Sequence, residues 1–524
     1  MITWQRADSK VSALMGENKG IKEGDAVRPS LYAIPFRLGG KEIVFHTLTR
    51  QCVETDHFAL FEKPRSLIYN EKDPEMRELV KADFLVPSDR DEVSKYTGLL
   101  TLLRRAEAPK AGFTGYTILP TTACNARCLY CYEEGLPHEM MGEAVLEQTV
   151  QYILATRKKD SPLRFHFFGG EPTLGEKTID RICDAMEAAE ISFTSGMISN
   201  GSLINDAMAR KAKEKWHLKN IQITLDGREE VYCQRKRYHA FSGSPYRAVL
   251  KGIHALLEQE IRVNIRLNVD ENNLKELMLL TEELEEEFKE ESLISLYCHS
   301  IFAEEGDDPC RDNEALYAGM AELNDKLAVF NRNRRERHKG KETLSQEPAE
   351  DADIDWEPRT EAAPEAYYDR QGKLKRYYCM VDNPAVGPVI LPDGRLNLCE
   401  HIGELPVVGS VYEKEPVKKE EYVTRGREKN EKCRRCPLLP SCTDFSGCPT
   451  RCRDCYRETL AKEKNALRWL ESEDRLPPVN IKKDGRILRV TEPDRAFLTA
   501  HREDILPSYL KPEETIKASS FFTL

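Results

Sequence analysis

The sequence predicts an α/β protein built on a parallel sheet, and three observations support this prediction. Between residues 113 and 300, short apolar runs typical of strands alternate with longer amphipathic segments typical of helices. Most strand-like runs end at a glycine-containing or small polar turn. The segments between runs are long enough for helical crossovers, which parallel pairing requires. The pattern leaves an open wound sheet and a barrel as alternatives.

The individual elements follow from the same periodicity. Strand-like runs are expected at residues 116–119, 164–168, 197–199, 221–225, 263–269 and 293–298. Helices are expected around residues 146–154, 179–189, 204–216, 248–258 and 274–288. Upstream, two apolar runs at 31–38 and 41–49 flank Gly39-Gly40 and predict a hairpin, followed by helices near 75–81 and 91–105.

A chain of 524 residues is too long for one ordinary domain. We expect a small, winged-helix-like α+β module at 1–112, the α/β core at 113–330, a charged linker or insertion at 331–369, a cysteine-rich domain at 370–460 and a charged tail at 461–524. The boundaries follow shifts in composition, since the segment 331–369 is dense in charge and contains three prolines.

The charge and the cysteine content limit the possible functions. A formal net charge of −11 argues against a protein that binds nucleic acids or membrane surfaces, because those partners are themselves negatively charged. No apolar run approaches the roughly 18–20 residues that cross a bilayer, and we expect a cytoplasmic protein. Sixteen cysteines, many closely spaced, then indicate metal binding rather than disulfides. Five scattered cysteines are expected to be incidental: Cys52, Cys183, Cys233, Cys298 and Cys310.

The first cysteine cluster follows the first strand-like run. Cys124, Cys128 and Cys131 lie within one loop, and three thiolates so spaced can bind three irons of a four-iron cluster. The fourth iron would then have no protein ligand. The alternative is a structural zinc site, which requires four ligands and would have to recruit His138.

Four motifs in order give this region a family resemblance. The run Cys124-x3-Cys128-x-Tyr130-Cys131 is followed by Phe168-Gly169-Gly170-Glu171-Pro172, by Ser199-Asn200-Gly201 and by Thr224-Leu225-Asp226-Gly227. This order resembles the radical S-adenosylmethionine (SAM) superfamily over about residues 113–300. The resemblance implies a partial (βα)6 barrel of the TIM type. It also implies a [4Fe-4S] cluster that reductively cleaves SAM to a 5′-deoxyadenosyl radical, which abstracts hydrogen from the substrate.

The resemblance also implies which residues bind SAM. Tyr130 is expected beside the adenine, and the methionyl amino group near Gly169, Gly170 and Glu171. These positions close successive strands, at the face where such folds place their sites.

Further SAM contacts are implied at the next strands. Ser199 and Asn200 correspond to positions that contact the ribose or the carboxylate. Arg235 is expected to pair with the methionyl carboxylate, unless it belongs to a solvated basic face. Arg266 and Asn268 are weaker candidates.

The second cysteine region resembles the SPASM extension of radical SAM enzymes that act on peptides. A zinc ribbon would use four of these cysteines and leave at least four unexplained. The family pattern implies two auxiliary [4Fe-4S] clusters, an inner one on Cys379, Cys399 and Cys448, and an outer one on Cys433, Cys436 and Cys442 with Cys452 or Cys455. Five residues rather than three follow Cys442, so the assignment of the last three cysteines stays open. If the inner cluster has only three protein thiolates, its free iron is a hypothetical site for a substrate cysteine.

The N-terminal module directs the choice of substrate. A hairpin followed by small helices resembles the element that recognises leader peptides, which add a strand to the hairpin edge. A generic structural cap is the alternative. The preferred hypothesis is a peptide (RiPP) maturase that installs thioether cross-links in a cysteine-containing precursor peptide. The resemblance implies an external electron donor such as flavodoxin or ferredoxin.

Two alternatives remain. An anaerobic sulfatase-maturating enzyme, which forms formylglycine, shares the core and places a carboxylate after the second cysteine of the extension. Glu400 follows Cys399 and would then be the general base, although a surface glutamate is an equal alternative. From another class, the chain would be a non-catalytic zinc-binding scaffold for peptides.

Overall fold

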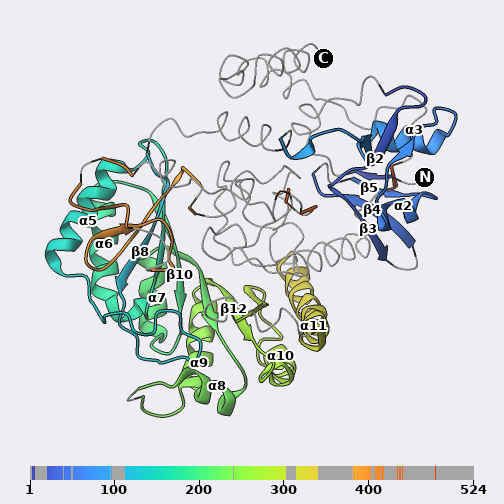
Figure 1. Ribbon diagram of the computed structural model, residues 1–524. Helices are drawn as coiled ribbons and strands as arrows, with labels where there is room; N and C mark the ends of the chain where they lie inside the picture. The colour runs from blue at the N-terminus through green and yellow to red at the C-terminus, as the bar shows by residue number, and fades with distance from the viewer. Residues whose placement is uncertain are drawn as a thin grey trace. The chain divides into compact units, whose positions relative to one another are not determined.

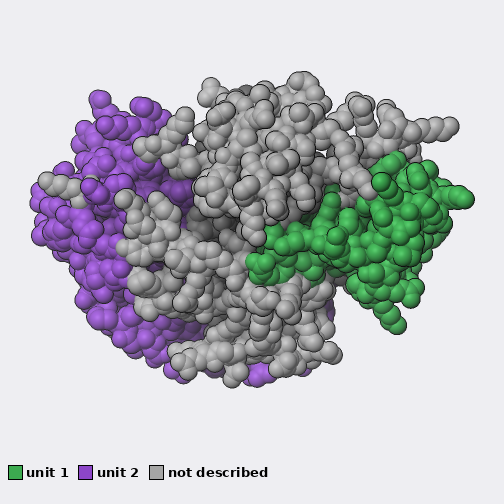
Figure 2. Space-filling model, turned by 45° about the horizontal axis from the view of Figure 1, so that its top comes forward, with its two compact units in different colours: residues 1–108, 364–378, 424–524 green, residues 109–363, 379–423 purple. Residues whose placement is uncertain are grey.

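The computed structural model describes about two thirds of the chain in two compact units. The described residues are 3–5, 21–38, 41–48, 51–94, 96, 112–239, 241–301, 314–339, 380–381, 383–402, 407–413, 415–417, 434, 436–437, 439–440 and 478–479. Figure 2 colours the two units, one comprising residues 1–108, 364–378 and 424–524 and the other residues 109–363 and 379–423.

The larger unit contains six parallel strands in sequential order, which confirms the α/β prediction. They are β8 (Gly115–Thr121), β9 (Leu163–Gly169), β10 (Phe193–Ser199), β11 (Leu218–Thr224), β12 (Arg262–Val269) and β13 (Ile294–Ser300). Each pairs in parallel with the next along the chain. Because all six strands run in the same direction, their carboxyl ends lie at the same edge of the sheet.

Helices follow the strands and cover the sheet (Figure 1). They are α5 (Glu143–Thr156), the short 3₁₀ helix η1 (Pro172–Gly175), α6 (Glu176–Ala188), α7 (Asp206–Glu214), α8 (Glu229–Lys236), α9 (Pro245–Glu258), α10 (Leu274–Glu287) and α11 (Glu314–Lys339). Two begin at side-chain caps, where Asn205 accepts from Met208 N and Ser244 from Arg247 N. The sequence predicted neither α8 nor α11, and α11 continues past residue 330, where we expected the core to end.

The core of this unit lies between the sheet and the helices. Every residue of β8 is buried, as is typical of a strand covered on both faces. Cys183 and Cys298 are fully buried within the same cluster of apolar side chains, as expected of incidental thiols. Among the described residues, no helix combines the length and the apolar character needed to cross a membrane.

Three C-terminal strands extend the same sheet beyond β8. Strand β14 (Val386–Ile390) pairs in parallel with β8, and β15 (Arg395–Asn397) and β16 (Gly409–Ser410) follow as antiparallel neighbours. Gly394, with φ +86°, makes the turn between β14 and β15. These strands belong to the segment expected as a separate cysteine-rich domain. Cys399 follows the end of β15 by two residues and packs in the core of the larger unit.

In the part of the smaller unit that the structure describes, two antiparallel sheets are accompanied by the short helices α2 (Phe58–Glu62) and α3 (Pro74–Lys81). One sheet has the order β17 (Pro478–Val479), β1 (Thr3–Gln5), β5 (Gln51–Glu54), β4 (Lys41–His46) and β3 (Ala33–Leu38). The other consists of β6 (Leu67–Ile68), β2 (Ala26–Pro29) and β7 (Leu85–Pro87). The pairing of β3 with β4 confirms the predicted hairpin, and α3 confirms the predicted helix near 75–81.

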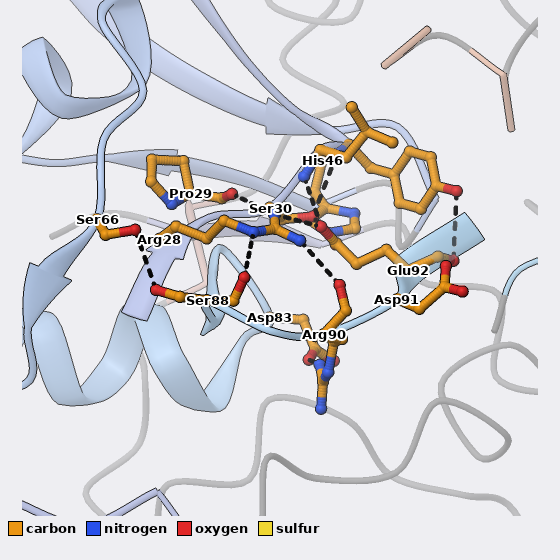
Figure 3. A network of polar contacts seen from close by, with 12 residues as sticks. Arg28, Pro29, Ser30, His46, Ser66, Asp83, Ser88, Arg90, Asp91 and Glu92 are labelled. Carbon is orange, nitrogen blue, oxygen red and sulfur yellow. Dashed lines mark hydrogen bonds and ion pairs between the residues drawn. The ribbon is translucent and has the colours of Figure 1, made fainter. Parts of the chain in front are cut away.

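A buried carboxylate joins two segments of this unit, residues 28–31 and 90–92 (Figure 3). Glu92, 5% exposed, accepts hydrogen bonds from Ser30 Oγ (2.5 Å), Leu31 N (2.8 Å) and Arg28 Nη1 (2.8 Å). The Arg28 guanidinium also donates to the carbonyl of Arg90 (2.9 Å). Residues 92–94 and 96 are helical, at the start of the helix predicted at 91–105, and the rest of that helix lies outside the described residues.

Candidate functional site

The predicted site residues gather at the carboxyl edge of the parallel strands. The loop with the three cysteines follows β8, Gly170 and Glu171 follow β9, Ser199 ends β10 and Asp226 lies just after β11. The strand order places these turns side by side. The structure therefore brings together motifs that are separated by about a hundred residues in the sequence.

The cysteine loop presents three thiols that are not disulfide-bonded. Cys124, Cys128 and Cys131 are each partly buried. Burial raises the pKa of Cys124 to about 12 and that of Cys131 to about 11, and it also raises the pKa of Cys128. Thiolates in such a site need a bound cation to be stable at neutral pH. This donor set fits an iron–sulfur cluster.

The thiols do not converge on one point. Within the part of the chain that the structure describes, no three His, Cys, Asp or Glu side chains form a site for a single metal ion. A four-iron cluster requires no such convergence, because each thiolate binds a different iron.

Two glycines let the end of β9 pack directly against the cysteine loop. A Cβ atom on Gly169, whose φ is +122°, would lie 2.3 Å from the carbonyl oxygen of Thr121. A Cβ on Gly170 would lie 2.4 Å from the carbonyl oxygen of Ala123. Hydrogen bonds from Gly170 N to Thr121 O (3.2 Å) and from Glu171 N to Ala123 O (2.9 Å) fix this contact. Any other residue at either position would push the loop away.

Glu171 is fully buried and bound only by neutral donors. Its carboxylate accepts from Thr173 N (3.1 Å), Thr173 Oγ1 (2.5 Å), Ser199 Oγ (2.8 Å) and Asn200 N (2.7 Å). Burial raises the pKa of Glu171, and these hydrogen bonds oppose the rise. None of the ion pairs within the described ranges includes Glu171. Ser199, predicted to contact SAM, thus holds Glu171.

Asn200 connects β10 to the cysteine loop. Its Nδ2 donates to Asn125 Oδ1 (2.8 Å), and its Oδ1 accepts from Ser202 N (2.9 Å) and Ser202 Oγ (2.6 Å). The side chain is 9% exposed. Asn200 therefore fixes the loop between the first and second cysteines.

Tyr130 lies in a buried polar network that the sequence did not predict. Its hydroxyl donates to Asp226 Oδ2 and accepts from Lys236 Nζ (2.8 Å) and Asn268 Nδ2 (3.0 Å). Lys236 also pairs with Asp226, 3.1 Å apart, and the two side chains are 2% and 0% exposed. No sequence signal distinguished Lys236, because it lies between Arg235 and Arg237 in a run that also fits an exposed basic face.

Of the two predicted arginines, Arg235 is buried and Arg266 is partly buried. Arg235, 8% exposed, donates from Nη2 to Asp270 (2.6 Å), and its guanidinium lies 5.9 Å from the centre of the Tyr130 ring. This excludes the solvated basic face. The Nε atoms of Arg235 and Arg266 are buried and have no hydrogen-bond partner in the described structure. A carboxylate would satisfy either.

Residues just after Cys399 contact the end of the cysteine loop, next to Cys131. The Tyr132 ring lies 4.6 Å from the His401 ring and is stacked at 6.5 Å on Phe168. Burial raises the pKa of Glu400 to about 7, against the effect of Arg266, and it also raises the pKa of Glu133 to about 7, with a contribution from Glu400. Glu400 is partly buried, and its Oε2 atom is shielded from solvent.

Two of the predicted auxiliary cysteines belong to the described residues. Cys399 is 8% exposed and Cys436 is partly buried, and neither forms a disulfide. Six others lie outside the described residues: Cys379, Cys433, Cys442, Cys448, Cys452 and Cys455. The division of these cysteines between two clusters stays a prediction.

Comparison with known families and proteins agrees with this geometry. Residues 118–291 match the model of the radical SAM superfamily. The Fe-coproporphyrin III synthase of Methanosarcina barkeri is 30% identical over 167 residues, which cover 32% of this chain and 40% of the synthase. A probable GTP 3′,8-cyclase of Archaeoglobus fulgidus is 27% identical over 173 residues, 32% of this chain and 54% of the cyclase. The chain thus spans about half the length of the curated relatives it matches.

A solved structure has the same fold. Histidine-tagged anSMEcpe with bound AdoMet covers 69% of this chain and 99% of its own length, with a TM-score of 0.51 and 16% identity. At this identity the likeness concerns the fold alone. It extends well beyond the residues of the family match.

Proposed function

Because residues 118–291 form a radical SAM domain, we propose that the chain is a peptide maturase. It cleaves SAM reductively and installs thioether cross-links in a cysteine-containing precursor peptide, with electrons from a flavodoxin- or ferredoxin-type donor. The observation that carries this proposal is the loop with Cys124, Cys128 and Cys131, three free thiols at the carboxyl edge of the sheet. Enzymes of this superfamily use a [4Fe-4S] cluster and SAM.

The residues around the loop have distinct tasks in this proposal. The three cysteines hold the cluster, which when bound supplies the electron for cleaving SAM. Tyr130 lies beside the adenine, positioned by Asp226. Glu171, surrounded by dipoles and without a cationic partner among the described side chains, favours the methionyl ammonium nearby. The buried Nε of Arg235 remains available for the methionyl carboxylate.

The cluster is tested by anaerobic reconstitution. We expect four-iron absorption and electron paramagnetic resonance (EPR) signals, and 5′-deoxyadenosine from SAM in the presence of dithionite. Changing Cys124, Cys128 and Cys131 together to alanine should abolish SAM cleavage. Cys233→Ala is the matched control, because this partly buried thiol lies on α8 and outside the loop. SAM cleavage that persists in the triple variant would contradict the proposal.

The peptide substrate is supported by the hairpin of the smaller unit. Strand β3 is at the edge of its sheet as far as the described residues go, and an edge strand offers main-chain groups to an incoming peptide strand. Leader binding should slow amide hydrogen exchange in residues 33–38, with β2 at 26–29 as the internal control. Binding without added protection at 33–38 would refute this role of the edge.

Formylglycine formation is the second candidate, favoured by Glu400. A partly buried carboxyl whose pKa is raised to about 7, one residue after Cys399, suits a general base at neutral pH. Mass spectrometry distinguishes the products. A thioether cross-link removes two hydrogen atoms and keeps sulfur, whereas conversion of cysteine to formylglycine also replaces sulfur by oxygen. Glu400→Gln should stop formylglycine formation while sparing 5′-deoxyadenosine release.

A metal assay separates both candidates from a zinc scaffold. Protein that contains zinc without iron, and releases no 5′-deoxyadenosine from SAM, would establish the scaffold. The peptide substrate itself would be sought as a short, cysteine-rich open reading frame next to the gene, and a neighbouring sulfatase would instead support formylglycine formation.

A further inference from the structure

The last residues of α8 and the residues that follow them bind the main chain of the cysteine loop. Arg237 adopts a left-handed conformation (φ +48°, ψ +60°) that ends the helix. Four hydrogen bonds then join the two segments: Arg127 N donates to Lys236 O (2.9 Å) and to Arg237 O (3.2 Å), Leu129 N donates to Arg235 O (3.0 Å), and His239 N donates to Asn125 O (2.9 Å). The loop between the cysteines is therefore shaped by the backbone of residues 235–239.

The Lys236 side chain lies beneath the same loop with all its donors used. Its Nζ atom is bound to Thr224 Oγ1 (2.5 Å), Tyr130 Oη (2.8 Å) and the carboxylate of Asp226 (3.1 Å). An ammonium has three N–H donors, so this set satisfies it. Asp226 in turn accepts from Asn268 Nδ2 (3.0 Å).

Both charges of this pair lie beside residues that flank a cluster ligand. The Tyr130 hydroxyl, two residues after Cys128, binds both Lys236 Nζ (2.8 Å) and Asp226, and the main-chain oxygen of Lys236 accepts a hydrogen bond from Arg127 N, directly before Cys128. Neither side chain is more than 2% exposed, so water screens these charges little. A buried ion pair contributes little net stability, because desolvation offsets the attraction. Its placement beside Cys128 therefore points to another role.

We propose that the buried Lys236–Asp226 pair positions the cysteine loop and sets the reduction potential of the cluster bound there. Reduction adds one negative charge to the cluster. The Lys236 ammonium stabilises that charge, and the Asp226 carboxylate opposes it. The proposal rests on the cluster and is independent of the peptide substrate.

The test measures the cluster midpoint potential in the full-length, anaerobically reconstituted protein by EPR-monitored redox titration without SAM. Lys236→Met leaves an unpaired negative charge and should shift the potential to a more negative value. Asp226→Asn leaves an unpaired positive charge and should shift it the opposite way. The double variant restores charge balance and should return close to the wild-type potential.

Arg334→Met is the matched control. This arginine is 1% exposed and also forms an ion pair, with Glu285 at 2.6 Å. It binds the carbonyl of Phe288 ahead of β13, and therefore lies at the opposite end of the strands. Its loss should destabilise the fold and leave the cluster potential unchanged.

The double variant decides the outcome. If the single variants lose iron, a double variant that retains the cluster supports the role of charge balance. A double variant as impaired as the worse single variant would overturn it, because packing alone would explain that result. Potentials equal to wild type in all variants that hold the cluster would also overturn it.

Discussion

Two buried glutamates, one in each unit, are held in opposite ways. Glu92 of the smaller unit pairs with Arg28 and accepts further bonds from Ser30 and Leu31. Glu171 of the larger unit is bound only by hydroxyl and amide donors, among them Ser199. The first arrangement is neutral overall and structural. The second keeps an uncompensated negative charge, which a structural role alone would not require.

The difference shows how the same residue type serves two purposes. In the smaller unit the cation comes from the chain itself, so the network closes on itself (Figure 3). In the larger unit the surrounding dipoles stabilise the charge and leave its attraction for a cation unused. In the proposed function, that cation is the methionyl ammonium of SAM.

The largest expected effect concerns one glycine of each unit. Gly169→Ala should destabilise the larger unit by about 4 kcal/mol or more and abolish cluster binding, because its Cβ would lie 2.3 Å from a main-chain oxygen. Gly24→Ala in the smaller unit has a similar positive φ (+91°) but open space, and should cost only about 1 kcal/mol. Denaturant unfolding and iron content measure both. Equal losses of stability in Gly169→Ala and Gly24→Ala would contradict this comparison of the two units.

The pH dependence of the larger unit comes next. Burial lowers the pKa of His166 on β9 to about 4, from 6.5. The folded state then binds fewer protons than the unfolded state between these values, so stability is lost as pH falls from 6.5 to 4. The loss is at most about 3 kcal/mol. Thermal melts at several pH values should show a flatter dependence for His166→Gln. Parallel curves for both proteins would count against this assignment.

The glutamates themselves give the third prediction. Glu171→Gln places an amide NH2 group against at least one donor, in the better orientation the N–H of Asn200, and should cost about 1–3 kcal/mol. It should also weaken SAM binding, measured by equilibrium dialysis. Hydrogen exchange in β9 and β10 reports the local loss of stability. Unchanged SAM affinity in a folded variant would show that Glu171 is structural, like Glu92.

The smallest effect is expected in the smaller unit. Glu92→Gln keeps an acceptor and loses a pair whose arginine is 28% exposed, so water replaces part of the interaction. The expected cost is about 1 kcal/mol. Cluster content and SAM cleavage should not change. A loss of SAM cleavage in this variant would be evidence that the two units depend on one another.

Much of the larger unit followed from periodicity. The alternation of apolar runs predicted strands β8 to β13 and the helices α5, α6, α7, α9 and α10, because local pattern determines these elements. Helix α8 was missed, since its charged sequence Glu229–Lys236 has no clear apolar face. Strand β14 was recognised only in the structure, because its partner β8 precedes it by more than 250 residues.

The site was predictable to a similar extent. The cysteines and the Gly169-Gly170-Glu171 turn carry strong local signals. The placement of Lys236 against Asp226 depends on which side of α8 is buried, which three-dimensional packing decides. The hydrogen bonds of Ser199 to Glu171 and of Asn268 to Tyr130 depend on the same packing, and the SAM contacts of Ser199 and Asn268 stay a prediction.

The pairing of β14 with β8 has a consequence for synthesis on the ribosome. Strand β8, buried along its whole length, is the first strand of the larger unit to emerge, and its β14 partner is made only after residue 386. Until then an apolar edge stays open to other chains. Nascent or C-terminally truncated chains should therefore aggregate, and a chaperone that shields this edge should raise the yield of active protein.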